Sequence, residues 1–242
     1  MGPARARPRL VALFGLSADP PTGRGGHLGI VRWCADELRV PSARGSKRRR
    51  GVDEVWVLPV YRHIYGAKRE MTPYGHRLAM AHLQFDGLDT RVPVRVVEAE
   101  RETYEEAVAA ARARGEDPAG VRVGTYDVVR HLEATNPGTR FVLVLGADTW
   151  ADLRSGKWRR ARELEDMVEV VALPRPGFGG GTIDDAPPLD DVSSSRARAT
   201  TDLAELRTIL EPAVVDYVIT HRLYAIGEAV ARGGGAPPGT VD

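Results

Sequence analysis

Five short apolar runs alternate with segments of helical periodicity, and this alternation constrains the fold more than any other feature of the sequence. Each run is short enough, and rich enough in Val and Leu, for a strand that is buried on both faces. The runs cover residues 10–14, 53–59, 92–97, 141–145 and 168–173. Strands that alternate with helices predict a parallel sheet covered on both sides. We therefore predict an α/β fold: a single doubly wound (Rossmann-like) parallel sheet of about five to six strands, with a small C-terminal helical part.

The segments between and after the apolar runs complete the predicted organisation. Apolar residues at helical spacing predict helices over residues 27–38, from Pro73 onward, and over 100–114, 126–135, 158–167, 201–210 and 212–223. We expect a single domain over residues 1–242, with disordered tails at 1–8 and 227–242. Residues 41–51 are basic and lack periodicity, which predicts an exposed loop insertion.

Composition excludes several classes of protein. Across 242 residues, 34 basic and 33 acidic side chains leave a net charge of +1, so no global charge points to nucleic acid. The single cysteine, Cys34, excludes an intrachain disulfide framework and fits a reducing compartment. No apolar run approaches the roughly 18 residues of a membrane span. We expect a cytoplasmic protein with small-molecule partners and no membrane partner; whether it forms a homo-oligomer stays open.

The loop after the first apolar run is the leading candidate for a phosphate site. Residues 10–30 read LVALFGLSADPPTGRGGHLGI, an apolar run followed by a Gly- and Pro-rich turn that ends where a helical pattern begins. A strand, a glycine-rich turn and a helix N-terminus are how α/β proteins hold phosphate. The glycine spacing does not match G-x-G-x-x-G, and no G-x-x-x-x-G-K-[ST] occurs, so neither a dinucleotide fingerprint nor a P-loop is present.

Polar residues also follow the other predicted strands. Because the carboxyl ends of parallel strands meet at one edge of a sheet, we expect these residues to gather in one pocket. They are Thr22 and His27 after the first strand, His63 and Lys68 after the second, Gly146 and Asp148 after the fourth, and Arg175 after the fifth. An imidazole at a helix N-terminus can donate a hydrogen bond to a phosphate, so His27 is a candidate catalytic side chain; a capping or packed histidine is the alternative.

At this point the motifs resemble a known family. Asp19-Pro20-Pro21, Thr22 and Gly26-His27 resemble the [H/T]-x-G-H loop of the nucleotidyltransferase superfamily, and most closely that of the nicotinate mononucleotide adenylyltransferases. Three further segments resemble family motifs in the same order: TYD followed by R-H-L at 125–132, LGAD at 145–148 with a Trp ten residues on, and VSSSRAR at 192–198. One departure is clear: four residues separate Thr22 from His27, where the family has two.

The resemblance implies roles for individual residues. Catalysis falls to His27, Lys68 and Arg198. ATP is expected to contact Gly15, Leu16, Thr22, Gly26, His27, Gly146, Asp148, Ser193, Ser194, Ser195 and Arg198. The acceptor substrate is expected to contact Lys68, Arg77, Thr125, Asp127, Trp158 and Arg175. Three alternatives stay open: Arg196 as the phosphate cation in place of Arg198, Trp150 as the stacking residue in place of Trp158, and His63 as a displaced family histidine.

The function that the resemblance implies is ATP-dependent adenylylation of nicotinate (or nicotinamide) mononucleotide in NAD biosynthesis. Such a transfer needs no covalent intermediate, so catalysis consists of positioning and charge stabilisation on phosphate oxygens. No Cys/His cluster has metal-ligand spacing, so we expect no protein-held metal, and Mg²⁺ bound mainly through ATP phosphates. The alternatives are an adenylyl- or cytidylyltransferase with another phosphorylated acceptor, and a nucleotide-binding homologue without activity.

Overall fold

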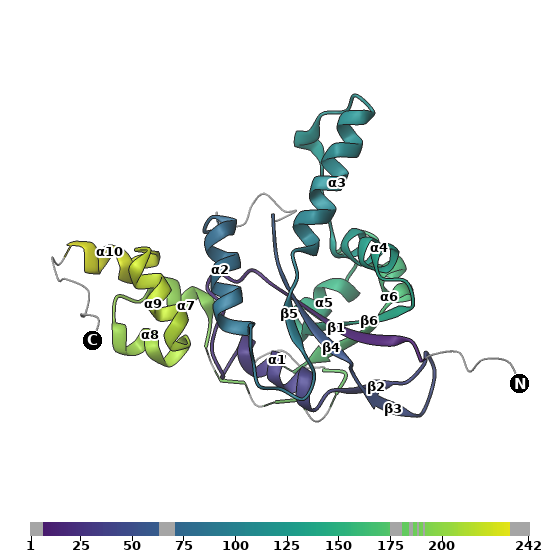
Figure 1. The fold of residues 1–242 in the computed structure, drawn as a ribbon, viewed down its shortest axis with the longest axis horizontal. Helices are drawn as coiled ribbons and strands as arrows, with labels where there is room; N and C mark the ends of the chain where they lie inside the picture. Colours follow the sequence, from purple (N-terminus) through teal and green to yellow (C-terminus); the bar gives the residue numbers. More distant parts are fainter. Residues whose placement is uncertain are drawn as a thin grey trace, which may run out of the picture. The chain divides into compact units, whose positions relative to one another are not determined.

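The chain forms a five-stranded parallel sheet (Figure 1). The computed structural model describes residues 7–62, 71–174, 181–183, 186–187, 189–190 and 192–232. The strand order is β5-β4-β1-β6-β7, and every neighbouring pair is parallel. The strands are β1 (Arg9–Leu16), β4 (Glu54–Pro59), β5 (Val94–Val96), β6 (Thr139–Gly146) and β7 (Glu169–Leu173). The predicted α/β fold is confirmed, and each of the five apolar runs supplies one strand.

The chain divides into two compact units. Unit 1 comprises residues 1–16, 31–70 and 87–186 and contains the sheet. Unit 2 comprises residues 17–30, 71–86 and 187–242 and contains the loop after β1 and the C-terminal helices. The helix α1 (His27–Asp36) begins in unit 2 and continues into unit 1. The single domain expected from the sequence stays a prediction.

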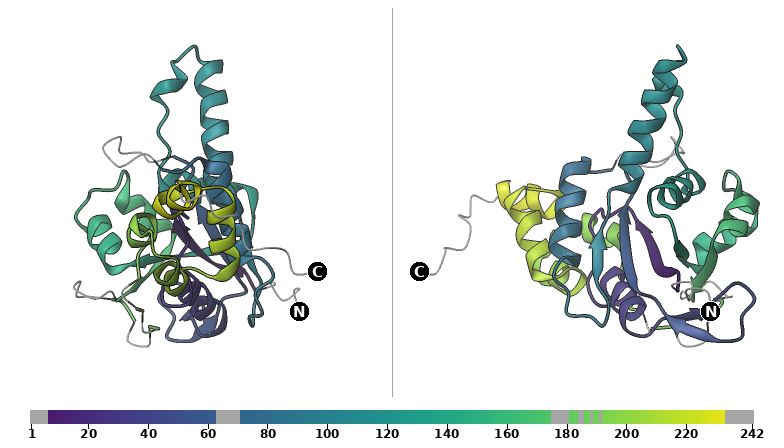
Figure 2. Two further views of the ribbon diagram at one scale, coloured as in Figure 1. Left: turned by 90° about the vertical axis from the view of Figure 1, so that its left-hand side faces the viewer. Right: turned by 45° about the vertical axis from the view of Figure 1, so that its right-hand side comes forward.

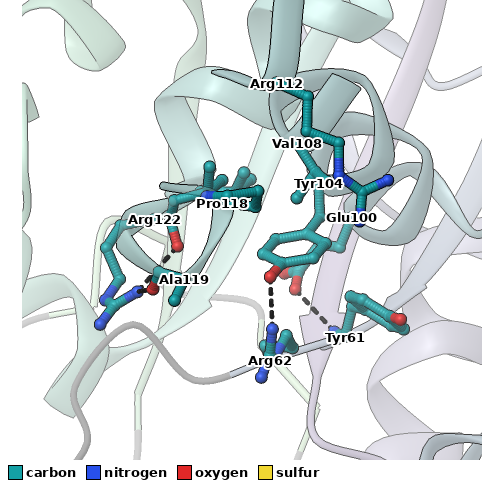
Figure 3. Close-up of a pocket in the computed structure, with 11 residues that line it drawn as sticks. Tyr61, Arg62, Glu100, Tyr104, Val108, Arg112, Pro118, Ala119 and Arg122 are labelled. Carbon is teal, nitrogen blue, oxygen red and sulfur yellow. Dashed lines mark hydrogen bonds between the residues drawn. The ribbon is translucent and has the colours of Figure 1, made fainter. Parts of the chain in front are cut away.

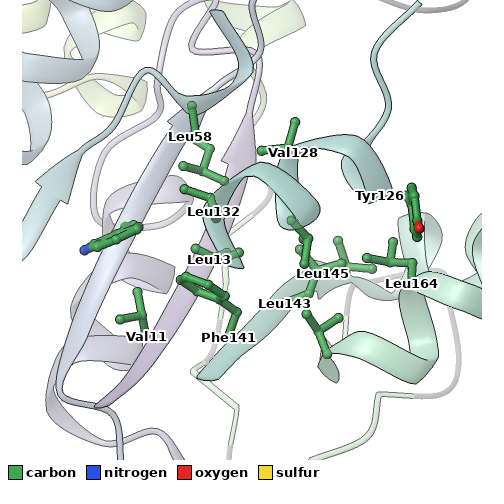
Figure 4. Close-up of a cluster of buried hydrophobic side chains, with 14 of the residues drawn as sticks. Val11, Leu13, Leu58, Tyr126, Val128, Leu132, Phe141, Leu143, Leu145 and Leu164 are labelled. Atoms are coloured by element: carbon green, nitrogen blue, oxygen red, sulfur yellow. The ribbon is translucent and has the colours of Figure 1, made fainter. Parts of the chain in front are cut away.

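The sheet of unit 1 is buried on both faces. Along β1, every residue from Leu10 to Phe14 is buried, although successive side chains point to opposite faces. On one face, Val11 and Leu13 pack against Phe141 of β6 and Leu132 of the helix α4 (Thr125–Thr135), as Figure 4 shows. This core extends to α6 (Ala161–Met167) through its buried Leu164. A fully buried leucine of this kind contributes about 1.5–3 kcal/mol, so this layer is a main source of the unit's stability.

One element of unit 1 extends away from the sheet. The helix α3 (Ala99–Ala113) follows β5, and the chain then returns beside it through the short 3₁₀ helix η1 (Pro118–Gly120). Figure 2 shows α3 and this returning segment projecting from the sheet. At its base α3 is tied to α4, where the His131 imidazole lies 2.9 Å from a carboxylate oxygen of Glu106. This contact connects α3 to α4.

The C-terminal helices form the core of unit 2. They are α7 (Ser194–Ala199), α8 (Leu203–Ile209), α9 (Pro212–Thr220) and α10 (Tyr224–Arg232), and they pack with α2 (Tyr74–Phe85). Met80 of α2 is fully buried against apolar residues of all four: Ala197, Leu206, Ile209, Leu210, Val214, Val215, Val218 and Ile226. None of the described helices is both long and apolar enough to cross a membrane.

Three expectations about segments differ from the structure. The predicted disordered tail at 227–242 is wrong over its first six residues, which belong to α10; the residues beyond 232 lie outside the described part. The basic insertion at 41–51 is not wholly a loop, since β2 (Arg39–Pro41) and β3 (Arg49–Gly51) pair as an antiparallel hairpin. The helix α5 (Ala147–Arg154) was not predicted, because its eight residues are too few to display a clear period.

Candidate active site

The two central strands of unit 1 end at the position where α/β sheets bind ligands. From β1 the chain runs outward to β4 and β5, whereas β6 and β7 lie on the other side of β1, so the direction of winding reverses between β1 and β6. Ligands bind outside the carboxyl ends of the strands at such a reversal. Of the predicted ATP contacts, Gly15 and Leu16 end β1, and Gly146 ends β6. A Cβ added at Gly15 would meet no atom within 4 Å, so the end of β1 is open.

Asp148, a predicted ATP contact, lies at the same edge of the sheet. It is in the first turn of α5, immediately after β6. A Cβ built on Gly146 would come within 2.7 Å of its Oδ1, so the Asp148 carboxylate folds back across the end of β6. The end of β6 thus presents a carboxylate, a group suited to accept hydrogen bonds from ribose hydroxyls.

The predicted acceptor contacts in unit 1 have structural partners of their own. Asp127 accepts a hydrogen bond from the Gly124 N–H at 2.9 Å and so caps the start of α4, while Thr125 is the first residue of that helix. Trp150 and Trp158 are both half-buried and pack against the core of unit 1. The contacts of these residues with a substrate stay predictions.

In unit 2 the loop after β1 places Thr22 and His27 in direct contact. The Thr22 N–H donates to Nδ1 of His27 at 3.0 Å, and the Thr22 hydroxyl oxygen lies 2.9 Å from the same nitrogen. That hydroxyl also accepts the backbone N–H of His27 at 3.0 Å. A backbone N–H can only donate, so Nδ1 is the acceptor and a neutral His27 ring carries its proton on Nε2. The two extra residues in the loop therefore do not separate Thr22 from His27.

The same contacts limit what the N-terminus of α1 can offer a phosphate. The first two backbone N–H groups of α1 are taken by Thr22: His27 N–H by its hydroxyl, and Leu28 N–H by its carbonyl oxygen at 3.1 Å. These two N–H groups are therefore already engaged within the loop. The small size of Gly26 is required by this arrangement, because a Cβ on it would lie 2.2 Å from the Thr22 hydroxyl.

Two side chains of α2 hold the loop from its carbonyl side. Gln84 donates to the Thr22 carbonyl at 3.1 Å. Arg77 is 2% exposed and donates to the carbonyls of Ser17 and Thr72, each at 2.8 Å. The sequence suggested Arg77 as a cation for the acceptor; the structure places it inside unit 2, bound to the backbone of the loop. Its contact with a substrate stays a prediction.

The serine segment, residues 193–195, and the helix α7 also contact the loop after β1. The Ser194 hydroxyl donates to the Pro20 carbonyl at 2.8 Å, and Ser193 caps α7 by accepting the Arg196 N–H at 3.2 Å. Arg198 donates to the Asp19 carbonyl at 2.5 Å and to the Ser195 hydroxyl at 2.9 Å. Arg196 instead pairs with Glu205. Arg198 and Arg196 were the two alternatives for the phosphate cation, and Arg198 is the one that contacts the loop after β1.

Asp19 joins this loop to the last described helix. Its side chain is 1% exposed and accepts a hydrogen bond from the Tyr224 phenol of α10 at 2.8 Å. Burial and the charge of Asp19 raise the pKa of the Tyr224 phenol far above its usual value, so the phenol remains a donor at neutral pH. Sequence reasoning assigned no role to Gln84 or Tyr224. No local pattern identifies them, because each meets the loop only through tertiary structure.

Three predicted site residues lie outside the described part of the chain, namely His63, Lys68 and Arg175. Their proposed roles stay predictions.

Comparison with known proteins finds relatives over most of the chain. Residues 46–200 match the family model described as cytidylyltransferase-like. A probable nicotinate-nucleotide adenylyltransferase of Anaeromyxobacter dehalogenans is 30% identical over 217 residues, which is 89% of this chain and 97% of that protein. A relative of the same description from Streptococcus pneumoniae is 32% identical over 74% of this chain and 78% of its own length.

Solved structures support the fold. The nicotinic acid mononucleotide adenylyltransferase of Plasmodium falciparum, in complex with NaAD, superposes with a TM-score of 0.63 at 18% identity, over 90% of this chain and 98% of that one. Sequence and fold thus agree, and the chain belongs to the nicotinate-nucleotide adenylyltransferase family, within the cytidylyltransferase-like proteins.

Proposed function

We propose that the chain transfers the adenylyl group of ATP to nicotinate mononucleotide, forming the dinucleotide and pyrophosphate. An oxygen of the acceptor's 5′-phosphate attacks the α-phosphorus of ATP, and the bond from that phosphorus to the bridging oxygen of the β-phosphate breaks. The observation that carries this proposal is the Thr22–His27 contact, which fixes the ring of His27 in a single hydrogen-bonding state. Family membership supports the reaction class and the acceptor.

His27 acts in this proposal as a hydrogen-bond donor. Because Thr22 occupies Nδ1, the proton-bearing Nε2 is the ring atom that can donate to an oxygen of the α-phosphate. Negative charge grows on the oxygens around the α-phosphorus as the new bond forms, and a donor already held in place stabilises it without reorganisation. The rigidity given by Thr22 is therefore part of the catalytic contribution.

Arg198 and the serine segment serve the leaving group in this proposal. A backbone carbonyl and a hydroxyl hold the Arg198 guanidinium beside the loop. A planar guanidinium matches the geometry of phosphate oxygens, so we assign Arg198 to the leaving pyrophosphate. Lys68 is expected to add a second cation from the loop after β4.

Magnesium enters the proposal as part of the nucleotide substrate. Within the described residues, no group of three or more His, Cys, Asp or Glu side chains is placed to hold a metal ion. Mg²⁺ keeps most of its waters and binds through few protein ligands, so the ion would be carried by the ATP phosphates and offset their charge. A cytoplasmic location and small-molecule partners stay predictions of the same account.

The test replaces His27 by alanine and uses the same substitution at another histidine as the control. We expect His27→Ala to lower kcat for pyrophosphate release by about 10²–10³-fold, the cost of losing one donor to a transition-state oxygen. ATP affinity should change little, because the donor acts mainly in the transition state. His82→Ala removes an exposed histidine of α2 that pairs with Asp86 and should leave kcat unchanged. Equal rates for wild type and His27→Ala would remove His27 from the mechanism.

A further inference from the structure

A pocket of about 490 Å³ lies between α3 and the segment that returns beside it, within unit 1 (Figure 3). Tyr104, Val108 and Arg112 line it from α3, and Pro118 to Val123 contribute the opposite wall. Tyr61 and Arg62, which directly follow β4, lie at its base. The volume is within the range of small-molecule sites. None of the lining residues belongs to the set assigned to adenylyl transfer.

The walls of this pocket are apolar and aromatic. The rings of Tyr61 and Tyr104 lie 5.5 Å apart at 52° to each other. Val108 on one side and Pro118 on the other add aliphatic surface, and all four side chains are only partly buried. An opening lined in this way favours a flat apolar ring, which can enter between the two walls and gain contact on both faces.

The charge of the pocket is positive. Three arginines line it and one carboxylate, Glu100, which accepts the Tyr61 N–H at 2.9 Å. Arg62 lies over the ring of Tyr104 at 5.1 Å, and Arg122 donates to backbone carbonyls at 2.8 and 2.9 Å. The Tyr104 ring and the backbone carbonyls are uncharged, so these contacts leave the positive charges of Arg62 and Arg122 in place.

Arg112 is the most available of these cations. It is exposed, and no acidic side chain among the described residues pairs with it. In Figure 3 its side chain extends along α3 toward Tyr104. A guanidinium in that position can bind a carboxylate or phosphate in bidentate fashion while the ring of the same ligand contacts the tyrosines.

From these observations we propose that the pocket is a second ligand site, which binds an anionic aromatic molecule of the mononucleotide class. The aromatic base would lie between Tyr104 and Pro118, and the phosphate would pair with Arg112 and Arg62. The site is built by α3, η1 and the residues after β4, and it includes none of the residues assigned to phosphate transfer.

The experiment is calorimetric titration of the full chain with AMP and with nicotinate mononucleotide, each alone, so that no turnover occurs. Inorganic phosphate serves as a probe without a ring. Wild type should bind at least one mononucleotide, with phosphate at least tenfold weaker. Tyr104→Ala and Arg112→Glu should each weaken this binding fivefold or more, or remove one binding site from the stoichiometry.

The control is Arg114→Ala, which removes a neighbouring arginine of the same projection that pairs with Glu116 outside the pocket. It should bind as wild type does. Because Tyr104→Ala could disturb α3, helix content is checked by circular dichroism, and the exposed Arg112→Glu change gives an independent result. Unchanged binding in both pocket variants, or no binding of either mononucleotide, would overturn the proposal. Pyrophosphate release measured alongside keeps this outcome separate from that of the proposed function.

Discussion

Gly26→Ala gives the sharpest prediction about the candidate active site. A methyl group at this position would lie 2.2 Å from the Thr22 hydroxyl oxygen and 3.0 Å from a methyl of Val192. The first distance is more than 1 Å below an ordinary contact, so Thr22 must move. Since Thr22 is 2% exposed and held through its carbonyl by Gln84, it has little room to do so.

The expected losses in kcat and in the free energy of unfolding follow from the contacts that Thr22 makes. Overpacking of a dense site costs about 1–3 kcal/mol. Displacing the Thr22 hydroxyl also leaves the His27 backbone N–H without its acceptor, at about 1–3 kcal/mol if it stays buried. A shift of about 1 Å in a catalytic group can cost roughly 10²-fold in rate. We therefore expect Gly26→Ala to lower kcat about 10²-fold and to lower the free energy of unfolding by about 2 kcal/mol.

The assay is steady-state pyrophosphate release, with urea unfolding as the stability measurement. Gly75→Ala is the matched control: the same substitution in the first turn of α2, where a Cβ meets no atom within 4 Å. It should keep full activity and gain up to about 1 kcal/mol, since alanine is the better helix former. A Gly26→Ala enzyme with wild-type kcat would refute the idea that Thr22 must stay against His27.

Two further predictions concern the serine segment and the sheet. Arg198→Gln should lower kcat about 10–10²-fold, the cost of one charged hydrogen bond to phosphate, whereas Arg196→Gln should not; equal losses in the pyrophosphate assay would contradict the assignment. Glu54 is buried, which by itself would raise its pKa, but hydrogen bonds from Trp56 and Arg9 outweigh burial and hold that pKa below its usual value. Its stabilisation is thus complete above the unfolded pKa of about 4.3 and lost as pH falls through the lower folded value. Glu54→Gln should therefore cost about 1 kcal/mol at pH 7 and much less near pH 3 in urea melts; a pH-independent difference would contradict this.

The sheet was predictable because its signal is local. Each strand is an apolar run, and the alternation with helices fixes a parallel order without further information. The hairpin of β2 and β3 was missed for the opposite reason. Its strands are three residues long and contain arginines such as Arg49 and Arg50, so backbone pairing rather than an apolar pattern defines it.

The candidate site was predictable in its residue types but not in its contacts. His27 follows from its place after a glycine-rich turn, yet the bond to Thr22 depends on how the loop folds back, which spacing alone does not reveal. Arg77 was interpreted as a substrate cation because the family that the chain resembles carries an arginine in the helix after the loop that follows the second predicted strand. Its burial becomes favourable only through carbonyls that another segment supplies, and that is tertiary information.

The central claim is adenylyl transfer to nicotinate mononucleotide, and one measurement tests it most directly. The purified 242-residue chain is mixed with ATP, Mg²⁺ and nicotinate mononucleotide, and both products are quantified, pyrophosphate enzymatically and the dinucleotide by mass. We predict that the two appear in a 1:1 ratio, with a rate that depends on His27. ATP binding without pyrophosphate release, with nicotinate or nicotinamide mononucleotide as acceptor, would contradict the account.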